Sequence, residues 1–127
     1  MSLRGFSTIS FWADDVPAAV AWYAEFLGVD AYFTNAGPDG RVAYAEFRVG
    51  DSEDELGIVD RRYAPPGAAD GPGGAIMYWH VDDLDATVAR VRALGAEVVM
   101  EPTENPGAGH RECWFRDPDG YTVVVAG

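Results

Sequence analysis

The sequence predicts an α+β protein built from two copies of one module, each running strand, helix and three strands. The first observation is internal similarity: Tyr78–Gly95 (YWHVDDLDATVARVRALG) follows the pattern of Ser10–Gly28 (SFWADDVPAAVAWYAEFLG). Each stretch has a strand-like run, an Asp-Asp pair, a segment of helical period and a closing glycine. The second observation is that three strand-like segments follow each helix. A chain of 127 residues is long enough for one compact domain in which two such modules share a core.

The first module is expected at residues 1–60. Residues 6–12 alternate polar and apolar side chains, as a half-buried strand does. The helix begins at Asp14 or Asp15, whose carboxylate caps free backbone N–H groups, and Gly28 ends it. The predicted apolar face of this helix consists of Val16, Val20, Tyr23 and Leu27. Strands are then expected at 29–35, 41–49 and 55–60, with turns at 36–40 and 50–54.

The second module is expected at residues 75–127, after a linker at 61–74 that is rich in proline and glycine. A strand at 75–81 precedes a helix that starts at Asp83 and ends at Gly95. The predicted apolar face of that helix consists of Leu84, Val88, Val91 and Leu94. Strands follow at 96–101, 110–116 and 121–126, with a loop at 102–109 and a tight turn at 117–120.

Charge and composition exclude several classes of function. The nine basic residues are all arginine and face 21 acidic residues, for a formal net charge of -12. Lysine-based covalent chemistry is therefore excluded, and binding to nucleic acid or to an anionic membrane surface is not expected. No apolar run is long enough to span a membrane, and Cys113 is the only cysteine, expected to be a buried and inert thiol. We expect a cytoplasmic protein.

Strand alternation predicts which side chains face away from the helices. Ile9, Phe11, Phe47, Met77, Trp79 and Phe115 are expected to face the helices. The opposite face is expected to carry Thr8, Ser10, Trp12, Tyr44, Glu46, Arg48, Tyr78, His80, Glu112, Trp114, Arg116, Thr122 and Val124. Within that set, the candidate ligand-binding residues are Thr8, Ser10, Trp12, Tyr44, Glu46, Tyr78, His80, Glu112 and Trp114. Aromatic rings beside carboxylates suit a planar molecule that can carry a positive charge.

Alternatives to ligand binding remain open for the charged residues of this face. The aromatic rings can instead form a dimer interface, with Glu46 and Glu112 paired to Arg48 and Arg116. His80 can serve as a general base, or join Glu46 and Glu112 in a metal site, although a lone histidine is more often structural. His110, which follows the loop, is expected to be exposed.

The motifs DDV…WYAEFLG, HVDDLDATVARVRALG and FRDPDGYTVVV resemble the vicinal oxygen chelate superfamily. That group includes glyoxalase I, extradiol dioxygenases and bleomycin-resistance proteins. The resemblance implies an eight-stranded curled mixed sheet that forms a cup, with the helices outside and the ligand inside. It also implies a cup that is often completed by a second subunit, so we expect a homodimer.

The resemblance further implies where a divalent metal would bind in the enzymes of the superfamily. They use His, Gln or Glu at one position of the first strand and one of the last strand in each module. The matching positions here are Thr8 and Gly57 in the first module, or Glu55 if the register slips, and Ile76 and Val124 in the second. Ile and Val offer no metal ligand, so we expect no metal cofactor.

The sequence thus predicts metal-independent binding, or sequestration, of a small aromatic molecule such as an antibiotic, similar to the drug-binding resistance proteins. The alternative is a lyase, isomerase or dioxygenase of the same superfamily, with a non-standard metal site or with His80 as the base. A purely structural or regulatory dimer is the third interpretation.

Overall fold

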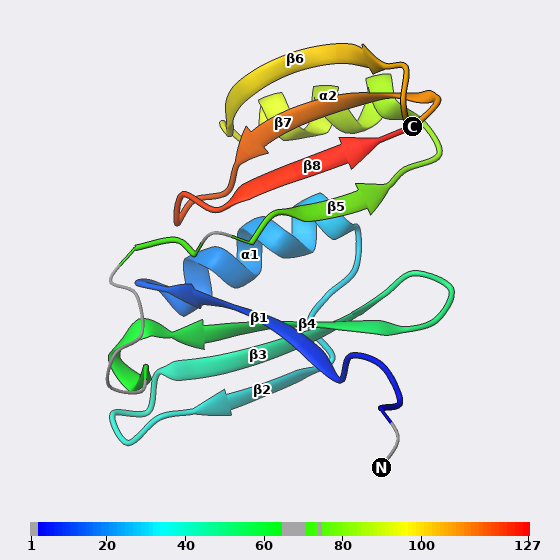
Figure 1. Cartoon of the computed structure of the whole chain (residues 1–127). Helices are drawn as coiled ribbons and strands as arrows, with labels where there is room; N and C mark the ends of the chain where they lie inside the picture. The colour runs from blue at the N-terminus through cyan, green and yellow to red at the C-terminus, as the bar shows by residue number, and fades with distance from the viewer. Residues whose placement is uncertain (1–2, 65–70, 74) are drawn as a thin grey trace. The chain divides into compact units, whose positions relative to one another are not determined.

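The computed structural model describes residues 3–64, 71–73 and 75–127. The chain divides into two compact units, residues 1–68 and 69–127. Among these described residues, each unit contains one α-helix and one four-stranded sheet. Figure 1 labels these elements along the chain. The predicted α+β class and the two modules of strand, helix and three strands are confirmed.

The first unit contains β1 (Thr8–Ala13), α1 (Val16–Leu27), β2 (Phe33–Ala36), β3 (Val42–Val49), β4 (Asp54–Asp60) and a short 3-10 turn (Arg61–Tyr63). Its sheet has the order β1-β4-β3-β2. The first strand is parallel to the fourth, and the other neighbours are antiparallel.

The second unit contains β5 (Met77–His80), α2 (Leu84–Ala93), β6 (Glu97–Asn105), β7 (His110–Arg116) and β8 (Thr122–Ala126). Its sheet has the order β5-β8-β7-β6, again with one parallel pair, β5 and β8. The topology of the first unit is therefore repeated.

The second aspartate of each Asp-Asp pair caps its helix. Asp15 Oδ1 accepts a hydrogen bond from Ala18 N at 3.1 Å, and Asp83 Oδ1 accepts one from Ala86 N at 3.0 Å. Gly28 takes a left-handed φ of 74° at the end of α1, a conformation that favours glycine. The two helix starts that reveal the repeat are thus structural features.

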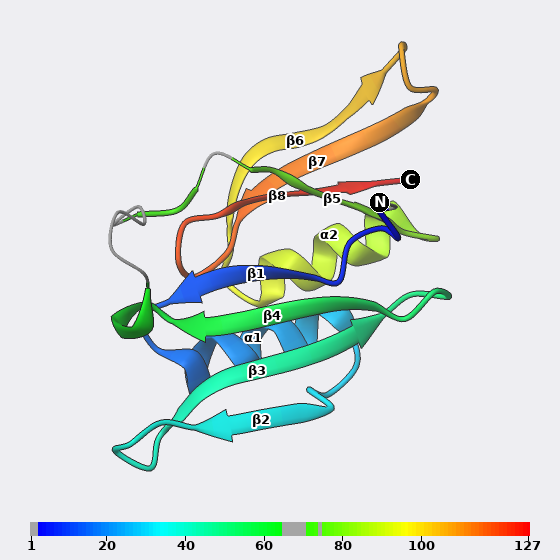
Figure 2. The same cartoon turned by 60° about the horizontal axis from the view of Figure 1, so that its bottom comes forward.

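The helix of the first unit packs against one face of its sheet. Figure 2 shows α1 behind β3 and β4, and Tyr23 lies 6.2 Å from Phe11 of β1, measured between ring centroids. The buried helix face is shifted from the predicted one: Trp22 and Phe26 are buried, whereas Val20 and Leu27 are only half-buried. The strand residues beneath are Phe11, Ala13, Ala45, Phe47, Leu56 and Ile58, all buried.

The helix of the second unit buries the face that the sequence predicts, except that Leu94 is half-buried. Its leucine and valines are buried with Cys113, Phe115, Val123 and Val125 of the sheet. Burial also raises the pKa of the Cys113 thiol. Ile9, predicted to be core, is 37% exposed, whereas Phe11 and Ala13 further along the same outer strand are buried.

Three strands differ by three residues from the predicted length. β2 and β5 are each four residues long instead of seven. β6 continues through Pro102 to Asn105, where a loop was predicted. This proline is tolerated because β6 is the outer strand of its sheet and its pairing with β7 shifts register between Met100 and Thr103. Within the predicted linker, residues 61–63 form the 3-10 turn, while 65–70 and 74 lie outside the described residues, so the linker at 61–74 stays a prediction.

Candidate functional site

The side of each sheet opposite its helix carries the candidate ligand-binding residues. In the first unit the register places them in three rows across β1, β4 and β3. The rows are Thr8, Glu55 and Arg48; Ser10, Gly57 and Glu46; and Trp12, Val59 and Tyr44. The residues between them along the strands, such as Ala45 and Phe47, are buried on the helix side.

Glu46 is the centre of the first face. The hydroxyls of Tyr32 and Tyr44 each donate a hydrogen bond to one of its carboxylate oxygens. These bonds lower the pKa of Glu46, chiefly through Tyr32 and then Tyr44. The same carboxylate raises the pKa of Tyr32 to about 12, and burial together with Glu46 raises the pKa of Tyr44. Glu46 is therefore a fixed anion held between two aromatic rings.

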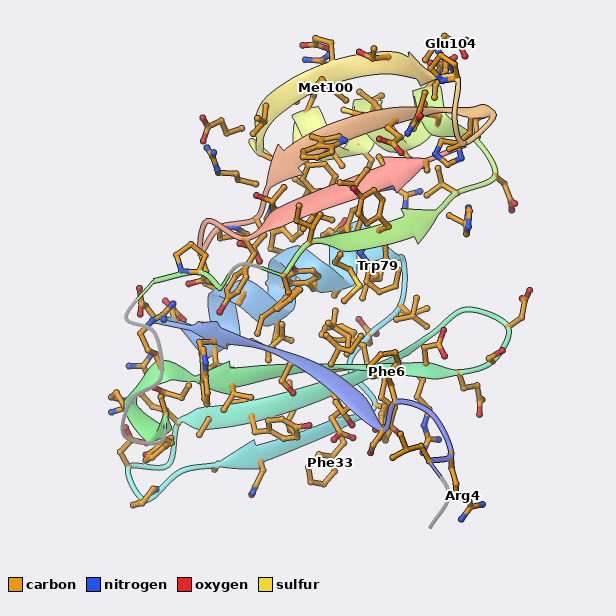
Figure 3. The ribbon with its side chains drawn as sticks, in the orientation of Figure 1. Arg4, Phe6, Phe33, Trp79, Met100 and Glu104 are labelled. Carbon is orange, nitrogen blue, oxygen red and sulfur yellow. The ribbon has the colours of Figure 1, made fainter. Side chains whose placement is uncertain are left out.

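Arg48 pairs with Glu55, at 3.7 Å from its Nε to Glu55 Oε1, and not with Glu46 as one alternative proposed. Its guanidinium lies 4.1 Å above the ring of Tyr32. Thr8 Oγ1 donates to the other oxygen of Glu55 at 3.2 Å. Phe33, labelled in Figure 3, lies 6.4 Å from the ring of Tyr44 and extends the aromatic surface.

Gly57 lies beneath two side chains of this face. A Cβ atom at Gly57 would lie 2.6 Å from Ser10 Oγ and 3.0 Å from Tyr44 Oη. Gly57 pairs with Ser10, as Val124 pairs with Tyr78 in the second unit. Gly57, and not Glu55, is therefore the counterpart of Val124.

On the helix-free side of the second sheet, small residues of β8 lie between large residues of β5 and β7. Val124 and Ala126 of β8 are buried, and they pair with Tyr78 and His80 on one side. On the other side they pair with Trp114 and Glu112 of β7. The rings of Tyr78 and Trp114 meet edge to face, 6.3 Å apart and at 84°.

Glu112 is the buried carboxylate of the second face, with 7% of its surface exposed. It accepts hydrogen bonds from His110 Nε2 at 3.0 Å, from Asn105 Nδ2 at 3.0 Å and from Trp114 Nε1 at 3.2 Å. These donors lower its pKa, His110 most strongly. Arg116, an alternative partner for Glu112, instead lies 3.3 Å from Glu97.

His110 and Asn105 are functional candidates that sequence reasoning missed. His110 was predicted to be exposed, but only 25% of its side chain is exposed, and its ring is hydrogen-bonded to Glu112. Its position two residues before Glu112 on one strand was a signal for a shared face. Asn105 was assigned to a loop because the extension of β6 was not predicted. The ring of His80 lies 6.4 Å from that of His110.

Both faces carry a carboxylate and an aromatic ring on the third strand of the unit, but these two residue types occupy opposite positions. In the register of the sheets, Glu46 pairs with Gly57, and Trp114 pairs with Val124, so Glu46 and Trp114 are equivalent. By the same register, Tyr44 is equivalent to Glu112. Each unit therefore places a carboxylate and an aromatic ring side by side on its third strand, in opposite order.

The residues at the superfamily's metal positions do not fit a divalent ion. Gly57 has no side chain and its Cβ space is taken by Ser10, Val124 is a buried aliphatic residue, and Ile76 is a 41% exposed one. Among the described residues, no group of three or more His, Cys, Asp and Glu is arranged to hold a metal ion. The displaced site of Glu46, His80 and Glu112 combines residues of both units and stays a prediction.

Within residues 3–64, 71–73 and 75–127, no helix has the length and apolar character needed to cross a membrane.

Comparisons with known proteins agree with this architecture. A curated Mycobacterium tuberculosis protein named "Putative glyoxylase CFP32" is 33% identical over 102 residues, which cover 69% of this chain and 39% of that protein. The chain thus spans about two fifths of that relative. A Vibrio cholerae protein named "Probable lactoylglutathione lyase" is 27% identical over 115 residues, covering 87% of this chain and 81% of that protein.

A solved structure shares the fold: a glyoxalase-related enzyme from Fulvimarina pelagi superposes with a TM-score of 0.80 at 18% identity, covering 98% of this chain and 88% of that one. The sequence profile of the Glyoxalase/Bleomycin resistance protein/Dioxygenase superfamily matches residues 5–125. With both modules inside that match, the chain belongs to the Glyoxalase/Bleomycin resistance protein/Dioxygenase superfamily.

Proposed function

We propose that this protein binds a small aromatic cation, such as a cationic antibiotic, without a metal ion, and so sequesters it. One observation carries the proposal. The helix-free face of each sheet holds a carboxylate of lowered pKa, Glu46 or Glu112, bonded to the polar atom of a neighbouring aromatic ring. A cationic ring system is the ligand that both features favour together.

The two carboxylates retain capacity for a ligand. An ionised carboxylate can accept about four hydrogen bonds. Glu46 accepts two, from Tyr32 and Tyr44, and Glu112 accepts three. Each can therefore accept a further bond from an N–H⁺ group while its present donors hold it in place.

The aromatic rings beside the carboxylates are open enough to be covered. Tyr78 is 53% exposed and Phe33 is 47% exposed, whereas the Arg48 guanidinium already lies over the ring of Tyr32. A cation over such a ring gains on the order of 0.5–2 kcal/mol. Because about 1.4 kcal/mol is a tenfold change in affinity, two contacts of this kind separate a cation clearly from a neutral or anionic molecule of the same shape.

Metal independence is part of the proposal and is supported by the aliphatic and glycine residues at the metal positions described above. The named relatives include a lactoylglutathione lyase. The superfamily name also includes the bleomycin resistance proteins. The proposed role, binding without lyase chemistry, follows that branch of the superfamily.

The test compares two planar probes of opposite charge, the cation 9-aminoacridine and the anion acridine-9-carboxylate, in calorimetric titrations. We expect the cation to bind in preference to the anion. Glu46→Gln and Glu112→Gln should each weaken cation binding by about tenfold, which corresponds to about 1.4 kcal/mol.

The matched control is Glu104→Gln, an exposed carboxylate near the end of β6 that is labelled in Figure 3. It removes the same charge away from both aromatic groups and should leave the affinity unchanged. Equal binding of both probes would show that charge does not contribute to binding, and equal losses in all three variants would show that the attraction is only the net acidity of the chain.

A further inference from the structure

Arg48 already covers part of the aromatic surface of the first face. Its guanidinium lies 4.1 Å from the centre of the Tyr32 ring, within the range in which the face of an aromatic ring attracts a cation. Its Nε also lies 3.7 Å from Glu55 Oε1. A ring beneath and a carboxylate at the edge are the two features that the proposed ligand requires. The first face therefore already holds a planar cation, one that belongs to the chain itself.

The partners of Arg48 are held in place by contacts of their own. The hydroxyl of Tyr32 donates to Glu46, and the backbone N–H of Tyr32 donates to Glu46 O at 2.9 Å. Glu55 accepts a hydrogen bond from Thr8 Oγ1 at 3.2 Å, and only 26% of its side chain is exposed. The ring and the carboxylate are thus fixed independently of the guanidinium.

Arg48 itself is weakly held. Its side chain is 49% exposed, and its 3.7 Å separation from Glu55 exceeds the length of a charge-assisted hydrogen bond, about 2.7–2.9 Å. Ion pairs between exposed side chains contribute little to stability, and a long arginine side chain regains conformational freedom when it is released. A ligand that makes the same two contacts can therefore displace it.

We propose that Arg48 is a tethered competitor for the cation site of the first face, which a ligand must displace before it can lie on Tyr32 beside Glu55. The inference rests on the proposed cation binding and names the residue that limits it in one unit. The ligand class is a planar cation with N–H groups at its edge, such as a guanidinium, an amidinium or an aminoacridinium. A tetrahedral ammonium group replaces the charge but not the flat contact with the ring.

The second unit pairs its equivalent arginine elsewhere. By the sheet register, the position of Arg48 corresponds to Arg116. Arg116 is opposite Thr122, where the first unit has Glu55. Threonine has no charge to hold a guanidinium, and Arg116 Nη1 lies 3.3 Å from Glu97 of β6 instead. We therefore expect competition on the first face only, which makes the two faces unequal cation sites.

The competition lowers the apparent affinity of the first face. When only a fraction of the molecules has an open site, the apparent dissociation constant rises by the inverse of that fraction. We expect Arg48 to cover the site in about nine of ten molecules, which raises the dissociation constant about tenfold.

The test is a titration with 9-aminoacridine followed by proton–nitrogen correlation spectra, in which the backbone amide signals of Glu46 and Trp114 report the two faces separately. Arg48→Gln should lower the dissociation constant of the first face about tenfold and leave that of the second face unchanged. The matched control is Arg92→Gln, because Arg92 of α2 is also 49% exposed and paired with a carboxylate, Glu101. It should change neither constant by more than about twofold.

Arg48→Lys separates coverage of the ring from simple charge. Lysine keeps the positive charge but lacks the planar group that covers the ring and meets the carboxylate. We expect this variant to show most of the gain of Arg48→Gln. Native affinity in Arg48→Lys, no gain in Arg48→Gln or an equal gain in Arg92→Gln would overturn the proposal.

A measurement on the ligand-free native protein tests the position of Arg48 directly. Protons held over the face of an aromatic ring give signals shifted upfield. The Nε–H signal of Arg48, identified by its loss in Arg48→Gln, should show this shift and lose it in Tyr32→Leu. A signal without the shift would overturn the proposal whether or not 9-aminoacridine binds.

The proposed function and this inference can fail separately. First-face binding that is detected in Arg48→Gln but not in the native protein would support the competition and contradict cation binding by the native first face. Equal first-face binding by both proteins would leave the proposed function standing and overturn the competition.

Discussion

Glu112 shows how one residue can be both buried and charged. Moving an ionised carboxylate out of water is costly unless its oxygens are hydrogen-bonded. Three donors, from Asn105, His110 and Trp114, meet that requirement. The same donors hold the carboxylate in one orientation.

The lowered pKa of Glu112 predicts a pH dependence of stability. Because its pKa is lower in the folded than in the unfolded chain, its contribution is full above the ordinary carboxyl range and is lost as the pH falls through the folded value. We expect the stability of the native protein to fall more steeply between about pH 5 and about pH 3 than that of Glu112→Gln. Urea midpoints measured across that range test this, and parallel curves would contradict it.

The close packing around Gly57 predicts that a side chain at this position destabilises the protein. Alanine there would place Cβ 2.6 Å from Ser10 Oγ and 3.0 Å from Tyr44 Oη. We expect Gly57→Ala to reduce the free energy of unfolding by about 1–3 kcal/mol, since an overpacked site must shift its neighbours. Gly73→Ala, where a Cβ would meet nothing within 4 Å, is the control and should change stability by less than about 0.5 kcal/mol. A neutral Gly57→Ala would show that Ser10 and Tyr44 can move aside.

Alternation along the strands predicted the placement of most of these residues. Tyr44 and Glu46 lie on one face with Gly57, as expected from a period of two. Tyr32 was not identified because the prediction for 29–35 gave no pairing partner, whereas its backbone N–H donates to Glu46 O. Pairing across strands depends on register, which a single sequence does not specify.

At the scale of the elements, the two helix starts are the most predictable features. The capping aspartates Asp15 and Asp83 make a local interaction, three residues along the chain, that needs no tertiary context. The extension of β6 could not be predicted, because Pro102 normally ends a strand and is tolerated here only on an outer strand with shifted register. Asn105 was missed for that reason.

The cap of α2 gives a prediction with a matched control. Asp83→Ala removes the hydrogen bond to Ala86 N and should cost about 1 kcal/mol of unfolding free energy. Asp82→Ala removes the neighbouring exposed carboxylate and should change stability by less than about 0.5 kcal/mol. Urea denaturation of both variants measures the difference, and equal effects would mean that charge, and not capping, is responsible.

At the scale of the whole molecule, the repeated module has kept its fold and changed its site residues. Both sheets have the same strand order, yet the carboxylate and the aromatic ring exchange places between Glu46 and Trp114, and between Tyr44 and Glu112. The backbone topology is set by many apolar contacts, whereas each site residue can change alone.

The homodimer expected from the sequence stays a prediction, and light scattering would report a mass of about 27 kDa, twice the chain mass of 13.7 kDa.

The most direct test of metal-independent cation binding is a calorimetric titration of chelator-treated protein with 9-aminoacridine, repeated after addition of Ni²⁺ or Zn²⁺. We predict saturable binding by the treated protein, with the same affinity when metal is present. Binding that appears only after metal is added, together with stoichiometric metal uptake, would contradict the account.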